Sequence, residues 1–316
     1  MTKATRRLDL EVQNVIDVFA QAFPRGFAGA GVERVREFGR QGDALVPTGP
    51  AMHSVVNTDV PGVGGSSIPI RVYKPTSRGL LPVLIYLHGG GWCVGSINGS
   101  VDYLCRSIAA AADIAVISVD YRLAPEHKAP AAVEDVMAVL DFVRASPESE
   151  GLDSVRIAIG GDSAGANISA AVTHLDRDRG ERLAAQILLY PATEYAVNRP
   201  SWVDNANAPI LTAADTLWFW DQYLATPDDR RDPRMVPALS RSFKDLPPGL
   251  ILVAEFDPLR DDGLHYAELL RSGGTEVRTQ RYERACHGFM TMPGLRDQVH
   301  GVEIVASFLR DALAPV

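Results

Sequence analysis

A serine stands at the apex of a glycine-flanked turn, between a segment typical of a buried strand and a segment typical of a helix. The turn is Gly161-Asp162-Ser163-Ala164-Gly165, with a β-branched apolar run before it and small residues at helical spacing after it. Such a turn strains the serine and pushes its hydroxyl clear of the sheet. The two glycines lie where a side chain would collide with the neighbouring backbone. A glycine-rich turn with a surface serine is the alternative, but the strand-turn-helix context favours a nucleophile.

A second glycine-rich run offers hydrogen-bond donors for a negatively charged intermediate. A fully apolar strand is predicted at 82–87, and it ends in His88-Gly89-Gly90-Gly91-Trp92. Three consecutive glycines leave their backbone N–H groups unobstructed, as the oxyanion hole of an acyl-transfer enzyme requires. A phosphate-binding loop is the alternative. The run lacks both the Gly-Lys-Ser/Thr ending and the Gly-x-Gly-x-x-Gly spacing of such loops, so we favour the oxyanion loop.

A serine nucleophile also needs a base and an acid that orients the base, expected after it in the order acid, then histidine. Asp257 lies just past a predicted strand, and Glu255 is the competing acid. We expect Asp261 and Asp262 in the first turn of the next helix, where they are favourable to its dipole. His287 follows a late strand and precedes a glycine, so we predict that it is the base.

The elements that must position these residues alternate between strands and helices. In chain order we predict helices at 8–23 and 30–38, strands at 54–60, 68–73, 82–87 and 114–119, a helix at 131–144, a strand at 155–159, a helix from 166, strands at 185–190 and 250–254, a helix at 261–270, a strand at 277–282 and a closing helix up to 313. This alternation predicts an α/β fold with a mostly parallel sheet and right-handed crossovers.

One segment, between Pro191 and Pro248, interrupts the alternation because it contains no good strand. It carries an aromatic helix with Thr212 as an N-cap candidate, and a charged, proline-interrupted stretch at 228–234 that predicts a loop. The aromatic residues of the helix are Trp218, Phe219, Trp220 and Tyr223. An ordinary crossover would pack these rings on the sheet, whereas a lid would contribute a wall to a substrate pocket. We favour the lid, because open α/β sheets bind ligands at this edge.

The composition excludes several classes of protein. The chain has 316 residues, 46% of them hydrophobic, and a formal net charge of −8, with no basic stripe, so we expect no nucleic-acid partner. It has no signal-peptide core and no apolar stretch long enough for a membrane helix, so we expect no membrane insertion. Three widely spaced cysteines form neither a disulfide framework nor a zinc-ligand pattern. We therefore expect no metal, no cofactor and a cytoplasmic location.

The chain resembles the hormone-sensitive-lipase-like esterases, also called bacterial family IV esterases, from about residue 50 to its C-terminus. The matching stretches are His88-Gly89-Gly90-Gly91-Trp92, Asp120-Tyr121-Arg122-Leu123-Ala124-Pro125-Glu126-His127, Gly161-Asp162-Ser163-Ala164-Gly165, Asp257-Pro258-Leu259-Arg260-Asp261 and His287-Gly288-Phe289, in the family's order. Family members often have proline where this chain has Lys128, and glycine where it has Ala166. Neither departure involves a catalytic atom.

The resemblance implies an α/β-hydrolase fold with a mostly parallel eight-stranded sheet, helices on both faces and a helical cap. Residues 1–50 would form N-terminal helices that contribute to the cap, and residues 51–316 the catalytic domain, with 191–248 as a cap insertion. It implies Ser163 as the nucleophile, His287 as the base, Asp257 as its orienter, and the N–H groups of Gly90, Gly91 and Ala164 as oxyanion donors. The charges of Arg122 and Glu126 would brace the oxyanion side.

Together these features predict a serine carboxylesterase of the EC 3.1.1 class that acts on a small-molecule ester through an acyl-enzyme. A deacetylase, an amidase or an acyltransferase would use the same triad. Some receptors for small ligands share the fold but have lost a triad member, and here all three members are present. A homodimer is compatible with the sequence.

The aromatic residues bear on the size of the substrate. Trp92, Trp218, Phe219 and Tyr223 are the candidates to line the pocket above the serine. Because the rings of one helix cannot all face the sheet, we expect at least one large ring of the aromatic helix to do so. A closed aromatic wall favours acyl groups of about two to six carbons, because a methylene gains only about 0.8 kcal/mol where it finds room and clashes elsewhere.

Overall fold

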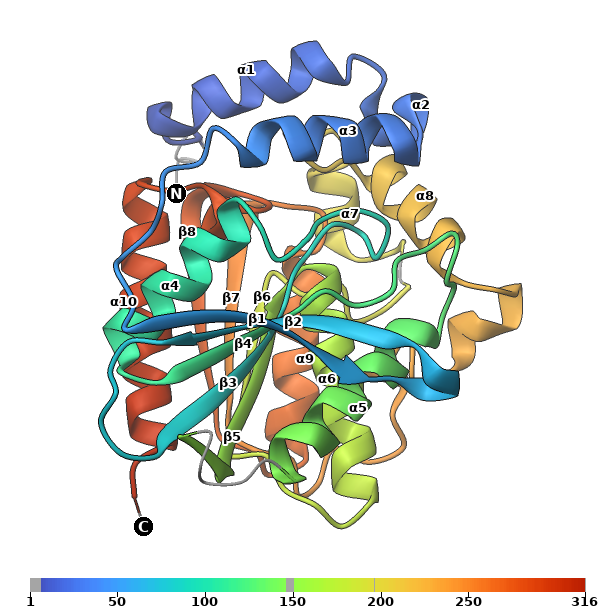
Figure 1. Ribbon diagram of the computed structural model, residues 1–316. Coiled ribbons are helices and arrows are strands. Elements are labelled where there is room, and N and C mark those ends of the chain that lie inside the picture. The colour runs from blue at the N-terminus through green and yellow to red at the C-terminus, as the bar shows by residue number, and fades with distance from the viewer. Residues whose placement is uncertain (1–6, 146–150, 196, 316) are drawn as a thin grey trace, which may run out of the picture.

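The computed structural model describes residues 7–145, 151–195 and 197–315 (Figure 1). Its sheet has eight strands in the order β1-β2-β4-β3-β5-β6-β7-β8. The strands are β1 (Ser54–Pro61), β2 (Ser67–Lys74), β3 (Leu81–Leu87), β4 (Ala115–Val119), β5 (Leu152–Asp162), β6 (Ala185–Leu189), β7 (Gly249–Phe256) and β8 (Val277–Cys286). β2 is antiparallel to β1 and to β4, and every other neighbouring pair is parallel. The predicted α/β-hydrolase fold with a mostly parallel eight-stranded sheet is confirmed.

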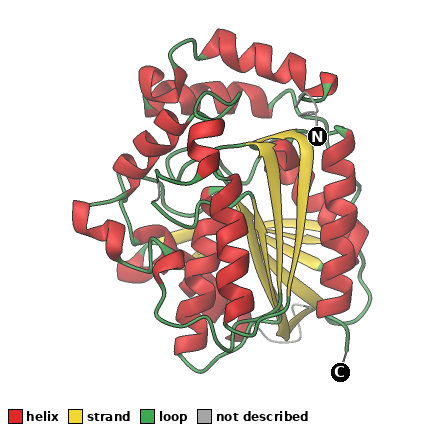
Figure 2. Cartoon of the chain, turned by 180° about the vertical axis from the view of Figure 1, so that it is seen from behind, coloured by secondary structure: helices red, strands yellow, loops and turns green. Residues whose placement is uncertain are grey.

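Helices cover both faces of the sheet (Figure 2). They are α4 (Ser100–Ala112), α5 (Ala131–Ala145), α6 (Ala164–Asp178), α9 (Arg260–Ser272) and α10 (Arg296–Ala312). Side chains of β3 alternate between the faces, as the pleat of a strand requires. Val83 and Ile85 belong to the apolar cluster that contains residues of α5 and α6, whereas Leu84 and Tyr86 belong to the cluster with α4 and α10. Burial on both faces explains why β3 is continuously apolar in sequence.

The N-terminal helices and the insertion lie together beyond one end of the sheet (Figure 1). The N-terminal helices are α1 (Gln13–Ala22), α2 (Gly26–Ala30) and α3 (Val32–Asp43), and the insertion contains α7 (Pro200–Asp204) and α8 (Ala213–Tyr223). The rings of Phe27 in α2 and Phe219 in α8 are 5.7 Å apart. The Ala28 N–H donates to the Asp215 carboxylate at 3.0 Å. These contacts make one layer of two segments that are far apart in the chain.

The sequence predicted some local structure incorrectly. The helix expected from residue 8 begins as a 3₁₀ turn, Leu10–Val12, and becomes α-helical at Gln13. Residues 228–234 were expected to form a loop, but a 3₁₀ helix spans Pro227–Arg231. It forms because the Asp229 carboxylate accepts from the Thr226 N–H at 2.7 Å and closes the turn. Further 3₁₀ turns span Val63–Gly65, Pro237–Leu239 and Phe289–Thr291.

Two other local predictions are confirmed. Thr212 is the N-cap of α8, since its hydroxyl accepts from the Asp215 N–H at 3.0 Å. Asp261 and Asp262 lie in the first turn of α9. Within the described ranges, none of the helices has both the length and the apolar character needed to span a membrane.

Candidate active site

The turn between β5 and α6 holds Ser163 in a backbone conformation that few non-glycine residues adopt, with φ +53° and ψ −115°. Its N–H donates to the Leu189 carbonyl at 2.8 Å, which ties the turn to the neighbouring strand. A Cβ on Gly165 would lie 2.0 Å from the Leu87 carbonyl oxygen, and one on Gly161 would lie 2.4 Å from the same atom. Both glycines are therefore required by close backbone contact, as predicted.

Ser163, His287 and Asp257 are brought together at the ends of β5, β8 and β7. His287 Nε2 lies 2.9 Å from Ser163 Oγ, and His287 Nδ1 lies 2.7 Å from Asp257 Oδ2. Since the carboxylate can only accept, the proton of the imidazole is on Nδ1, and the lone pair of Nε2 faces the serine hydroxyl. The other oxygen of Asp257 accepts from the Leu259 N–H at 2.8 Å, which fixes the carboxylate.

The neighbouring acids have other partners. Glu255 forms ion pairs with Arg260, at 3.1 Å, and with Arg281. Asp262 is completely buried and accepts from the Trp202 indole N–H at 3.0 Å. Burial raises the pKa of Asp262 well above its usual value. The two candidate acids therefore have different partners. Asp257 is hydrogen-bonded to the histidine, whereas Glu255 forms ion pairs with two arginines.

The N–H groups of Gly90, Gly91 and Ala164 donate to no acceptor within the described residues. The carboxylate of Asp162, immediately before the serine, holds the loop that carries two of them. It accepts from the Tyr86 hydroxyl at 2.8 Å and from the Gly89 N–H at 2.9 Å. Burial raises the pKa of Asp162, although these hydrogen bonds act in the opposite direction. We therefore regard these three N–H groups as the candidate donors to an oxyanion.

Trp92, the residue after the glycines, packs against α8. Its backbone has φ +60°, and the residue is 2% exposed. It stacks on the Tyr223 ring, with centroids 4.5 Å apart and planes at 6°, and it contacts Trp220 at 4.4 Å. The indole N–H donates to the Asn167 side chain at 3.3 Å. Trp92 and Tyr223 therefore pack against each other between the loop and the insertion.

The other two predicted pocket residues lie differently. Phe219 rests on the glycine loop, since a Cβ on Gly91, whose φ is +56°, would lie 2.2 Å from its ring. Trp218 is partly exposed and lines a mostly apolar cavity of about 510 Å³ between α3, α8 and the loop after β4. Val32 and Pro125 also line this cavity. Phe219 is thus the ring that lies over a candidate oxyanion donor.

Comparison with known proteins identifies the family of the chain. A protein-family model described as the α/β hydrolase fold matches residues 84–291. This range includes the serine, the histidine, the aspartate and the glycine loop. The chain belongs to the α/β-hydrolase family. Its match is to the hormone-sensitive-lipase-like group that the motifs resemble.

Individual relatives are named as ester hydrolases. The chain is 44% identical to the carboxylic ester hydrolase LipN of Mycobacterium tuberculosis over 77% of its own length and 66% of that protein. It is 39% identical to the carboxylesterase NlhH of the same organism over 89% of each chain. The solved structure of an esterase from Pyrobaculum calidifontis superposes with a TM-score of 0.90 at 36% identity, over 98% of this chain and 100% of that one. These comparisons confirm the predicted fold, family and general class of enzyme, a carboxylic ester hydrolase.

Arg36 of α3 is a residue at this site that the sequence did not indicate. Its guanidinium donates to the carbonyls of Cys93 at 2.8 Å and Ala124 at 2.9 Å, and it pairs with Glu126 at 2.7 Å. The hydrogen bonds from Arg36 lower the pKa of Glu126 to about 2. Arg122, the other expected brace, pairs with the buried Asp135 of α5 at 2.8 Å. The N-terminal helices are thus bonded directly to the segment after the glycines.

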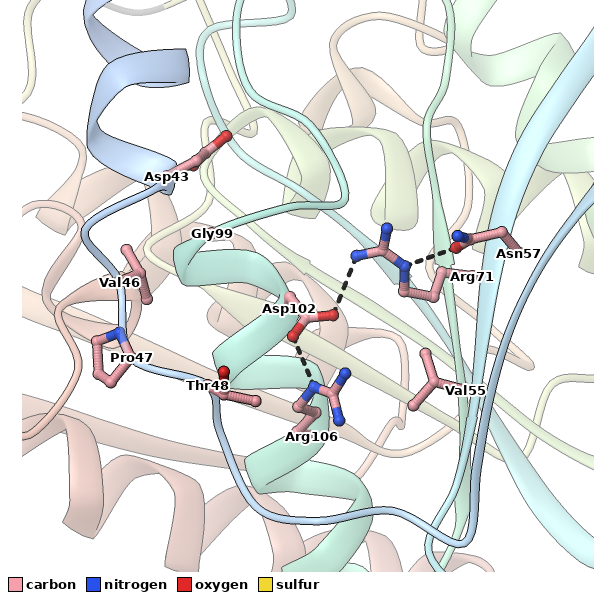
Figure 3. Close-up of a pocket in the computed structure, with 10 residues that line it drawn as sticks. All are labelled: Asp43, Val46, Pro47, Thr48, Val55, Asn57, Arg71, Gly99, Asp102 and Arg106. Carbon is pink, nitrogen blue, oxygen red and sulfur yellow. Dashed lines mark hydrogen bonds and ion pairs between the residues drawn. The ribbon is translucent and has the colours of Figure 1, made fainter.

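A polar cavity of about 420 Å³ lies elsewhere, between α4 and the segment that joins α3 to β1 (Figure 3). Its Arg71 donates to Asp102 and Asn57 at 3.0 and 2.7 Å, and Arg106 donates to the same aspartate at 2.6 Å. None of the candidate catalytic residues lines it. Because Arg71 and Arg106 both pair with Asp102, we assign this cluster a structural role.

The described part of the chain contains no group of three or more histidine, cysteine, aspartate or glutamate side chains placed to hold a metal ion. The three cysteines are buried and unpaired.

Proposed function

We propose that the protein is a serine carboxylesterase with Ser163 as the nucleophile, His287 as the base and Asp257 as its orienter. The observation that carries the proposal is the unbroken hydrogen-bond chain from Asp257 through His287 to Ser163, next to three N–H groups without an acceptor in the described structure. A serine alone is a weak nucleophile at neutral pH, and an adjacent oriented imidazole activates it.

The proposed reaction has two halves. Ser163 Oγ attacks the ester carbonyl carbon while His287 Nε2 takes the hydroxyl proton, and the carbonyl oxygen becomes an oxyanion. The N–H groups of Gly90, Gly91 and Ala164 stabilise this oxyanion, and loss of one such donor typically costs about two to three orders of magnitude in rate. Collapse of the intermediate breaks the bond to the alcohol oxygen, which receives the proton from His287. Water then releases the acid by the same steps in the acyl-enzyme.

We propose that the N-terminal helices and the 191–248 insertion together form the cap over this site, and that the cap favours short to medium acyl chains. Phe219, resting on Gly91, supports this limit, since it narrows the space beside a candidate oxyanion donor. The proposed partner is a small-molecule ester, and the proposed preference is for acyl groups of about two to six carbons.

The test uses p-nitrophenyl esters of increasing acyl length with the purified protein and with Ser163→Ala. We expect hydrolysis of the short esters by the wild type only, together with covalent labelling of Ser163 by a fluorophosphonate, read by mass spectrometry. p-Nitroanilide analogues run in parallel test the amidase alternative. Ester hydrolysis that survives in Ser163→Ala, or labelling at another residue, overturns the proposal.

A further inference from the structure

The side chain of Lys128, in the segment between β4 and α5, contacts the end of α8. Its ammonium group donates to the carbonyl oxygens of Asp221, Gln222 and Leu224, at 3.2, 2.8 and 2.8 Å. The last carbonyls of a helix have no partner within the helix, and a cation there interacts favourably with the helix dipole. One side chain therefore provides hydrogen-bond donors for three carbonyl groups at the C-terminal end of α8.

The next residue completes the contact. The Ala129 N–H donates to the Tyr223 carbonyl at 2.9 Å. Four consecutive carbonyls at the end of α8, from 221 to 224, thus all accept hydrogen bonds from residues 128 and 129. A proline at position 128 would have no side-chain donor and could not form the three bonds of the lysine.

The turn held in this way carries the rings that touch the glycine loop. Tyr223 stacks on Trp92 at 4.5 Å, Trp220 contacts Trp92 at 4.4 Å, and Phe219 lies against Gly91. The segment that carries Lys128 also holds the loop directly, because the Ala124 N–H donates to the Trp92 carbonyl at 2.9 Å. The position of α8 relative to the candidate oxyanion donors therefore depends on this short segment.

We propose that Lys128 is a positioning residue that fixes the C-terminal turn of α8, and through its rings sets both the placement of the oxyanion loop and the longest acyl chain that fits. The inference rests on the proposed esterase function. A second tie, the Arg230 to Asp221 pair at 2.8 Å, lies on a more exposed part of the same helix. Exposed pairs contribute little, so this tie does not replace the lysine.

The test compares three variants with the wild type. Lys128→Met keeps the length of the side chain and removes the ammonium group, and Lys128→Arg restores a cationic donor. Lys244→Met is the matched control, because Lys244 is exposed and lies outside the site. For each protein, kcat and KM are measured on p-nitrophenyl butyrate and octanoate, and hydrogen exchange is followed in peptides covering residues 213–223.

We expect Lys128→Met to lower kcat on butyrate about tenfold, less than the loss of a whole oxyanion donor. The octanoate-to-butyrate ratio of kcat/KM should rise by about tenfold. Burial of one methylene can raise kcat/KM by at most roughly fourfold, so the extra methylenes of octanoate can account for this rise. Exchange at the end of α8 should become faster, Lys128→Arg should recover most of the wild-type ratio, and Lys244→Met should match the wild type throughout.

An octanoate-to-butyrate ratio within twofold of wild type in Lys128→Met overturns the inference, even where exchange is faster, because the lysine then serves stability alone. Equal changes in Lys244→Met also overturn it. Failure of the proposed function looks different, since wild-type protein would then hydrolyse neither ester. In that case exchange at 213–223 decides whether Lys128 positions α8. Should the methionine variant not fold, Lys128→Gln is used in its place.

Discussion

Replacement of Asp257 by asparagine tests the proposed triad most directly, because the structure states which hydrogen bonds survive. The side-chain oxygen of asparagine can still accept from the Leu259 N–H, which is bonded to Oδ1 at 2.8 Å. The new amide N–H₂ then faces His287 Nδ1, where an acceptor stood at 2.7 Å. Two donors cannot bond, so the imidazole must move its proton to Nε2. In that tautomer the ring donates to Ser163 and cannot take its proton.

The expected loss follows from the tautomer. We expect kcat on p-nitrophenyl butyrate to fall by about 10⁴, which corresponds to roughly 5 kcal/mol of transition-state stabilisation. The fold should change little, because the substitution keeps the shape of the side chain and its hydrogen bond with the Leu259 N–H, and the amide can donate to Nδ1 in the new tautomer. Initial rates at saturating substrate measure the first effect, and thermal unfolding measures the second.

Glu255→Gln is the matched control two residues before Asp257, near the end of β7. It removes a charge that pairs with the nearly buried Arg260, so it should lower stability by about 1–3 kcal/mol. It leaves the tautomer of His287 unchanged, so kcat should stay within about threefold of wild type. The reasoning is wrong if Asp257→Asn loses less than tenfold in kcat, or if Glu255→Gln shows the larger catalytic loss.

Further predictions concern the nucleophile, the pocket, metals and pH. Ser163→Ala should abolish ester hydrolysis with an unchanged melting curve, and retention of a few per cent of turnover would exclude Ser163 as the nucleophile. Phe219→Ala should move the acyl-length optimum to longer chains, and an unchanged profile would place the wall elsewhere. Prolonged EDTA treatment should leave activity intact, whereas activity lost and restored by a divalent ion would contradict a metal-free mechanism. Burial lowers the pKa of His174 from 6.5 to about 4. The pKa of His174 is lower in the folded state than in the unfolded state, so the folded state favours the neutral imidazole. The contribution of this neutral imidazole to the free energy of unfolding is therefore fully present above pH 6.5. Up to roughly 3 kcal/mol of the free energy of unfolding is lost as pH falls from 6.5 to about 4. His174→Gln should flatten the pH dependence of the unfolding free energy, and an equally steep curve would refute this assignment.

The sequence was sufficient for the features that depend on neighbouring residues. The strained turn at Ser163 has its two glycines within two residues of the serine, so the motif could be found locally, although the Leu87 backbone that requires them belongs to β3. The strand β3 is apolar on both faces because helices cover both faces, so its burial could also be anticipated. Asp257 was preferred to Glu255 from its place after the strand, and the structure gives the partners that separate them.

The sequence was insufficient where partners are far apart in the chain. Arg36 lies on an amphipathic N-terminal helix whose pattern predicts only a buried face, and its contacts with Cys93 and Ala124 have no local signal. The same applies to Lys128, whose acceptors are carbonyls at the end of another helix. Periodicity indicated that the rings of α8 face different directions, but it could not say that Tyr223 meets Trp92.

Long-range contacts of this kind are what a glycine-rich oxyanion loop requires. Consecutive glycines have more backbone freedom to lose than any other residues, yet their N–H groups stabilise an oxyanion only when their directions are fixed before the reaction. Here three contacts fix the loop. Asp162 of the serine turn accepts from the Gly89 N–H, and Arg36 of α3 donates to the Cys93 carbonyl. The Tyr223 ring of α8 stacks on Trp92. Helices α3 and α8 and the loop that carries the candidate donors therefore pack together as one unit. A substitution in α3 or α8 should change the rate without touching a reacting atom.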